Sequence, residues 1–162
     1  MIQRVQSIFL FLVVLAMIMV TFSSLWEQMN PDQTQKMKLT AWTVSTYSIE
    51  NGNEGTVMDQ KGVYYIGFLC IVAAFIALYS LFQFRNRLRQ MFLNMINSLV
   101  MGITLGVAVY QSYHSNMEFN PSVSGEFLMG FYAIIVAIIL NVISNRFIRK
   151  DEKLIRSVDR IR

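Results

Sequence analysis

A six-residue turn with three arginines, Arg85, Arg87 and Arg89, constrains this sequence more than any other feature. An apolar run of about twenty residues, 63–84, ends just before it, and another, 91–113, begins just after it. Each run has the length that crosses ~30 Å of hydrocarbon as a helix at ~1.5 Å per residue. The short link between the runs predicts a helical hairpin. Because short loops rich in Lys and Arg stay on the cytoplasmic side, the turn is predicted to lie in the cytoplasm.

Two further apolar runs complete a predicted set of four membrane spans, at about 5–26, 63–84, 91–113 and 127–148, with an outer loop at 27–62 and a tail at 149–162. The chain is 54% hydrophobic and only 15% charged, and the charges gather in loops and ends, as in a multi-pass membrane protein. Eleven of the fourteen Lys and Arg residues fall in the N-terminus, the arginine turn and the C-terminal segment. This distribution predicts that both termini are cytoplasmic. The alternative for the first run is a cleaved signal peptide, with Arg4 as its charged end.

The long outer loop carries the pattern of a β-hairpin. Residues 39–49 are rich in β-branched and aromatic side chains, residues 51–55 form a strong turn signal, and residues 56–58 suit a short return strand. A flexible polar loop is the alternative. An isolated hairpin is marginal in water, so we expect it to rest on the membrane helices or on a partner.

The C-terminal segment predicts a cytoplasmic amphipathic helix. Phe147, Leu154, Ile155, Val158 and Ile161 recur at helical spacing and form an apolar stripe, which Asp151 interrupts. The helix either extends the fourth span or lies on the membrane surface. Candidate contacts to anionic lipid headgroups or to a protein partner are the basic residues Arg85, Arg87, Arg89, Arg149, Lys150, Lys153, Arg156 and Arg160. A solvated tail that only fixes topology is the alternative. Because the cations stand beside apolar spans, we expect no nucleic-acid partner.

Amide and small side chains stand out inside the spans. The candidate interior polar cluster consists of Asn94, Asn97, Ser98, Asn141 and Asn145. These residues either join helices by hydrogen bonds, form an oligomer contact, or line a path for a polar solute. Gly102 and Gly106 continue the small stripe of the third span, and we expect another helix to approach them closely.

The sequence offers little for catalysis. No Asp, Glu, Lys, Arg or His lies within the core of any predicted span, which argues against a proton-coupled carrier. His114, Glu118 and Glu126 are the single candidate metal or acid–base group, and an ordinary solvated loop is the alternative. Cys70 is the only cysteine, so no internal disulfide can form. We therefore predict no catalytic residues, no metal site and no cofactor.

The two ends of the chain resemble those of a known family. Residues 1–7 read MIQRVQS and open directly into a span, and residues 145–162 read NRFIRKDEKLIRSVDRIR. Both are similar to the Domain of Unknown Function 4293 family, small four-span proteins known mainly from the Bacteroidetes group of bacteria. The resemblance covers the whole length and implies an integral protein of a bacterial inner membrane. It implies no reaction and no site residues.

These observations together predict an all-α membrane protein: a four-transmembrane-helix bundle with a small outer β-hairpin and a C-terminal amphipathic helix. A non-enzymatic scaffold or subunit of a membrane assembly is the favoured function. The alternative is a small oligomeric transporter or channel for a small molecule or a lipid. The expected partners are the lipid bilayer, anionic headgroups, and a membrane-protein partner or further copies of the chain.

Overall fold

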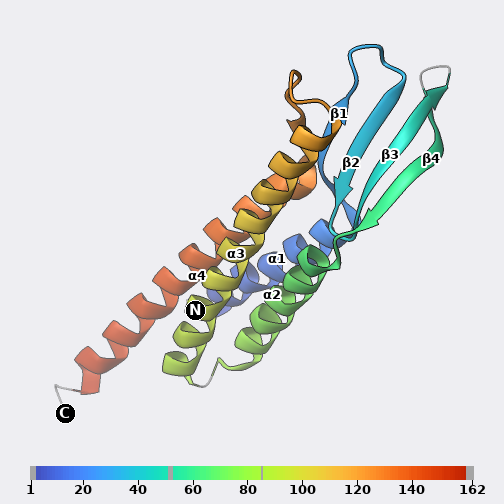
Figure 1. Cartoon of the computed structure of the whole chain (residues 1–162). Helices are drawn as coiled ribbons and strands as arrows, with labels where there is room; N and C mark the ends of the chain where they lie inside the picture. The colour runs from blue at the N-terminus through green and yellow to red at the C-terminus, as the bar shows by residue number, and fades with distance from the viewer. Residues whose placement is uncertain (1–2, 51–52, 85, 160–162) are drawn as a thin grey trace.

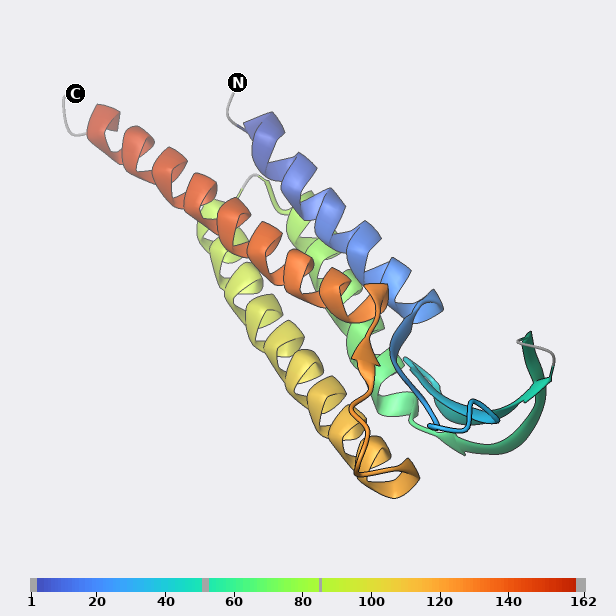
Figure 2. The ribbon, with the colours of Figure 1, turned by 90° about the horizontal axis from the view of Figure 1, so that it is seen from above.

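In the computed structural model, which describes residues 3–50, 53–84 and 86–159, the chain forms four helices and one five-stranded sheet. The sheet stands at one end of the helices (Figure 1), and α1 begins and α4 ends at the opposite end (Figure 2). The side chains of residues 6–50, 53–84 and 86–154 are described.

The helices are α1 (Gln3–Phe22), α2 (Tyr64–Phe82), α3 (Arg87–Phe119) and α4 (Met129–Asp159). Each packs against two neighbours, in the order α1, α2, α3, α4 and back to α1. Among the described residues, α2, α3 and α4 are long and apolar enough to cross a membrane, and Gln6–Phe22 of α1 forms a shorter apolar helix. The exposed surfaces of all four carry large apolar side chains, as lipid-facing helices do.

The expected all-α fold is wrong, because the outer loops form an antiparallel sheet. Its strands are β1 (Ser24–Met29), β2 (Gln35–Thr40), β3 (Thr43–Glu50), β4 (Asn53–Gly62) and β5 (Glu126–Phe127), in the order β4-β3-β2-β1-β5. The β3–β4 pair corresponds to the predicted hairpin, but its return strand begins at Asn53, within the predicted turn 51–55, and extends beyond the predicted 56–58. Residues 51–52 lie outside the described residues. Residues 39–49 do not form one strand, because Ala41 and Trp42 separate β2 from β3.

The first helix is shorter than predicted because its apolar run continues into β1. The helix ends at Phe22, and Leu25 and Trp26 are buried in the sheet, at 0% and 2% exposure. Trp26, which ends the apolar run, is therefore part of the sheet and its side chain is buried. Pairing with β2 on one side and β5 on the other fixes this strand.

Several bonds hold the sheet onto the helices. The Leu128 amide donates to the Leu25 carbonyl at 2.9 Å, immediately before α4 begins. The Gln28 side chain in β1 donates to the carbonyls of Asn120 and Val123, both at 2.8 Å. Lys61 at the end of β4 forms an ion pair with Glu118 near the end of α3. The sheet is thus fixed to the helix bundle at both edges.

Charged side chains on β1, β2 and β4 form a small surface network. Lys36 pairs with Glu27 at 2.8 Å, and Lys38 pairs with Glu54 at 2.7 Å. The hydrogen bond from Lys38 holds the pKa of the Glu54 carboxyl below its ordinary value. The Lys36–Glu27 pair joins adjacent strands, whereas the Lys38–Glu54 pair reaches across β3. Because the groups are partly exposed, we expect these pairs to align the strands more than to stabilise the sheet strongly.

At the other end of the bundle, the arginine turn connects α2 and α3. Asn86 caps α3, since its side-chain oxygen accepts the Arg89 amide at 3.2 Å. The third helix extends beyond the predicted 91–113 at both ends, to 33 residues. The fourth helix begins at Met129 and continues without a break to Asp159, so most of the predicted tail extends the span as one helix.

The expectation for the third-span glycines is wrong. Both Gly102 and Gly106 are exposed, and a Cβ atom added at either would meet nothing within 4 Å. Helical spacing places the two residues on one face of α3, but that face points away from α2 and α4. The close approaches are elsewhere: a Cβ on Gly130 would lie 2.7 Å from the Ser24 carbonyl oxygen, and one on Gly67 would lie 2.5 Å from the Trp42 ring.

Candidate functional site

The side of α3 that faces the other helices is mostly polar. Its buried residues recur every three or four positions and are Gln90, Asn94, Asn97, Met101, Thr104, Ala108, Ser112 and Ser115. Asn94 and Asn97 are fully buried, as is Asn141 on α4. A buried polar stripe on a membrane-spanning helix is costly, so it marks the candidate functional site.

Three helices meet through an amide cluster made of Ser80, Asn94, Asn97, Ser98 and Asn141. The Ser80 hydroxyl of α2 donates to the Asn94 side-chain oxygen at 2.6 Å. The Asn141 side-chain nitrogen of α4 donates at 2.8 Å to both the Asn94 carbonyl and the Ser98 hydroxyl. Interhelical hydrogen bonds of this kind contribute about 0.6 kcal/mol each on average in membrane proteins. The cluster therefore fixes the register of α3 against α2 and α4.

The amide cluster keeps unused hydrogen-bonding capacity. Among the described residues, buried polar atoms there without a protein partner are Asn94 Nδ2, Asn97 Nδ2, Asn97 Oδ1, Asn141 Oδ1 and, one helical turn further along α4, Asn145 Oδ1. An unpaired buried donor or acceptor costs about 1–3 kcal/mol. The unpaired groups include donors and acceptors and carry no charge.

A charged layer lies nearer to the end opposite the sheet. Asp151 on α4 is 6% exposed and accepts a hydrogen bond from the Gln6 side chain of α1 at 2.7 Å. Arg87 Nη1 of α3 lies 3.7 Å from the same carboxylate oxygen. Ser144 also donates to the Gln6 carbonyl, at 3.4 Å. This Asp151 layer joins α1, α3 and α4.

The basic residues that we predicted to contact lipid or a partner differ in exposure, as far as their side chains are described. Arg87 lies against Asp151 with its side chain only 16% exposed, so it faces the protein interior. Arg89, Arg149, Lys150 and Lys153 are exposed. Arg85, Arg156 and Arg160 lie outside the described side chains.

The candidate metal or acid–base group does not converge. His114 Nδ1 lies 3.9 Å from Glu118, but Glu118 is also bound to Lys61 of β4. Glu126 is part of β5, opposite Glu27 of β1. Within the described parts of the chain, no group of three His, Cys, Asp or Glu residues could hold a metal ion.

Gln6 and Asp151 were not among the predicted site residues. The sequence signal for this contact was the position of Asp151, which interrupts the apolar stripe of the C-terminal helix. A carboxylate on the buried face of a helix needs a hydrogen-bonding or charged partner. Its partner Gln6 lies near the other end of the chain, so no local pattern connects the two residues.

Comparison with known proteins identifies a family without assigning an activity. The sequence profile of the domain of unknown function DUF4293 matches residues 2–161. No curated protein matches the chain.

Proposed function

Because the chain belongs to the DUF4293 family, whose function is unknown, we propose that it is a non-enzymatic scaffold of a bacterial inner-membrane assembly. Four helices would anchor it, and the sheet would present a binding edge on the extracytoplasmic side. The edge strand β4 carries this proposal.

The ten residues of β4 are exposed along the whole strand. One side of the strand pairs with β3, and no other described strand pairs with its second side. A free strand edge is a template for an incoming extended segment, which gains main-chain hydrogen bonds. The strand has ten residues and no proline, while its Lys61 and its irregular pairing with β3 are features that discourage indiscriminate pairing at an edge. It carries Val57 and Met58 at 51% and 59% exposure, apolar area that a partner strand would cover.

The charge distribution supports the proposed orientation. The start of α1, the arginine turn and the basic end of α4 lie together at the end opposite the sheet (Figure 2). Cationic ends are retained in the cytoplasm, which would put the sheet outside. With 20 residues, α1 is about 30 Å long at ~1.5 Å per residue, enough for a fourth span.

Cysteine labelling tests the orientation. In intact spheroplasts of a Cys70→Ser variant, Asp32→Cys should react with a membrane-impermeant maleimide and Arg89→Cys should not. Both native residues are exposed, so burial cannot explain a difference. Labelling of Arg89→Cys alone would reverse the proposed topology.

Photo-crosslinking from the sheet edge tests the scaffold role. A benzophenone amino acid at Val57 should give one adduct of defined size in native membranes, whereas the same group at exposed Asp32 should not. Met58→Lys, which puts a charge on the edge, should reduce the adduct from Val57. Equal adducts from Val57 and Asp32, or none from Val57, would contradict the proposal.

A second candidate, passage of a small neutral solute, rests on the unpaired atoms of the amide cluster. Proteoliposomes swollen in neutral polyols would test it. Faster swelling than protein-free vesicles, abolished by Asn97→Leu, would favour this role over the scaffold.

A further inference from the structure

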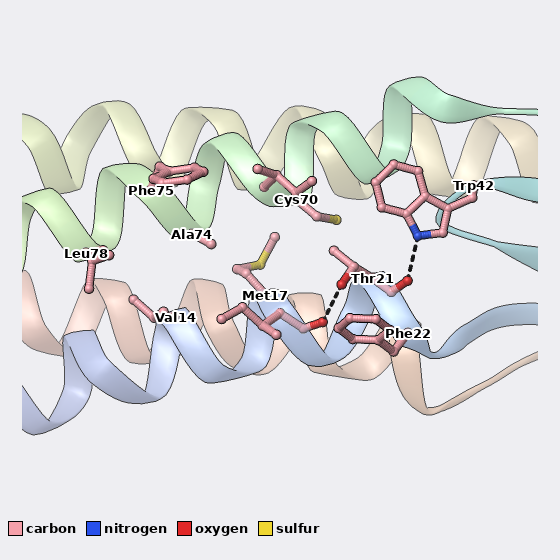
Figure 3. A pocket seen from close by; sticks show the side chains of 11 residues that line it. Val14, Met17, Thr21, Phe22, Trp42, Cys70, Ala74, Phe75 and Leu78 are labelled. Carbon is pink, nitrogen blue, oxygen red and sulfur yellow. Dashed lines mark hydrogen bonds between the residues drawn. The ribbon is translucent and has the colours of Figure 1, made fainter.

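A groove lies between the sheet-side half of α1 and the middle of α2 (Figure 3). Its volume is about 400 Å³, in the range of small-molecule sites. Val14, Met17 and Phe22 line it from α1, and Cys70 and Ala74 line it from α2. It is open on one side, among apolar side chains that face the membrane.

The polar groups of this groove are already bonded within the protein. The Thr21 hydroxyl donates to the Ile18 carbonyl at 2.6 Å. The Trp42 indole nitrogen donates to the Thr21 carbonyl at 2.8 Å. A guest would therefore find hydrocarbon surface and no free hydrogen-bonding side chain apart from the weakly polar thiol of Cys70. This chemistry selects an apolar occupant.

The dimensions of the groove distinguish between apolar occupants. Its lining extends over residues 14–22 of α1 and 70–78 of α2, which is ~12 Å at ~1.5 Å per residue. A partner helix is ~10–12 Å thick and would bury its apolar face over a longer distance than this. One leaflet of hydrocarbon is about 15 Å deep, half of the ~30 Å core. A single hydrocarbon chain lying along the helices matches the length and the volume.

The sheet-side end of the groove is closed by a side chain that is fixed by packing and by hydrogen bonds. Trp42 closes the sheet-side end, and its ring lies on the backbone of α2 at Gly67, where any larger residue would collide with it. The Gly67 amide donates to the Ala41 carbonyl at 2.8 Å, and the Val63 amide donates to the Trp42 carbonyl at 2.7 Å. The ring contact and these two backbone bonds thus fix Trp42 and its neighbour Ala41 against the start of α2.

The rim of the groove is continuous with the lipid-facing surface. Phe22 and Phe75 stand beside the opening with 86% and 66% of their surfaces exposed. Ala74 on α2 also lines the groove, and its small side chain leaves room there.

We propose that the groove binds one acyl chain of a phospholipid from the leaflet on the sheet side, with Trp42 above the chain. This site is independent of the proposed pairing at β4 and of the amide cluster.

The test uses the purified full chain in phosphatidylcholine nanodiscs that contain a phosphatidylcholine with a diazirine on one acyl chain. After irradiation, mass spectrometry should locate adducts mainly on the groove-lining peptides of α1 and α2. Ala74→Phe fills the groove and should lower these adducts to the level on the lipid face of α4. Val136→Phe adds the same ring at an exposed site on α4 and should leave them unchanged.

Two results would overturn the proposal. One is adducts spread over all four helices according to exposure and unaffected by Ala74→Phe. The other is a crosslink between two copies through the groove in place of a lipid adduct. If Ala74→Phe fails to fold, Ala74→Leu fills part of the same space and must lower the groove adducts by a smaller amount.

Discussion

Replacing Gly67 by alanine tests how the sheet is locked onto the membrane helices. The new Cβ atom would lie 2.5, 2.6 and 2.7 Å from three carbons of the Trp42 ring. Carbon atoms pack at about 3.5–4.0 Å, so the ring must retreat by about 1 Å. The ring cannot move freely, because its nitrogen donates to the Thr21 carbonyl. The backbone on either side is also fixed, since the Val63 amide donates to the Trp42 carbonyl and the Gly67 amide donates to the Ala41 carbonyl.

The magnitude follows from three contributions. Overpacking costs about 1–3 kcal/mol. Loss of the indole hydrogen bond adds about 1 kcal/mol. The gain from replacing glycine within a helix is about 0.5–1 kcal/mol. We expect Gly67→Ala to lower the free energy of unfolding by about 1–3 kcal/mol.

The molecule contains its own matched control. Gly102→Ala makes the same chemical change on an exposed face of α3 where nothing lies within 4 Å, so it should be neutral or stabilising. Reversible unfolding in mixed micelles, followed by tryptophan fluorescence in a Trp26→Phe background, would measure both variants. Trp42→Leu should remove most of the cost of Gly67→Ala, measured by circular dichroism. Equal stabilities for Gly67→Ala and Gly102→Ala would refute the packing argument.

Two further predictions concern charged groups. Asp151→Leu should lower the free energy of unfolding by about 2–3 kcal/mol, because Gln6 loses its acceptor and Arg87 loses its counter-charge. Asp151→Asn keeps an acceptor for Gln6 and should cost less in the same micelle assay. Equal losses for the two variants would show that the hydrogen bond from Gln6 contributes nothing. The hydrogen bond that Lys38 donates to Glu54 lowers the pKa of this carboxyl in the folded protein. The stability that Glu54 contributes is therefore complete above its ordinary pKa of 4.5 and is lost as the pH falls through its lower pKa in the folded state. The protection factors of the amides in β2–β4 should therefore decrease below about pH 4.5 more in the wild type than in Glu54→Gln, and identical pH profiles would contradict this.

The apolar helices could be predicted from the sequence because hydropathy and length are local properties. Helical spacing also places Asn94 and Asn97 on one face of α3, and the structure directs this face into the bundle. Spacing cannot show which face meets a neighbour, and for this reason the expectation for Gly102 and Gly106 was wrong. The result for these glycines depends on contacts with other helices, which no local pattern records.

The sheet was underestimated for the same physical reason. Leu25 and Trp26 continue an apolar run, and only pairing with β2 and with β5, about a hundred residues later, makes them a strand. Likewise, the junction at Trp42 depends on a glycine in the next helix. The expectations that failed all concern contacts distant in sequence.

The strand β5 links the assembly of the sheet to the order of synthesis. It reaches β1 from the connection between α3 and α4, so two membrane helices are made after β4 before the sheet can be completed. A ribosome adds about 5–20 residues per second, so the outer side of β1 remains unpaired for several seconds while the third helix is inserted. During that interval the growing chain exposes two free strand edges, and arrival of Glu126 and Phe127 closes one of them. A chain stopped before β5 would retain both edges, which makes it a substrate for membrane quality control and prone to aggregate.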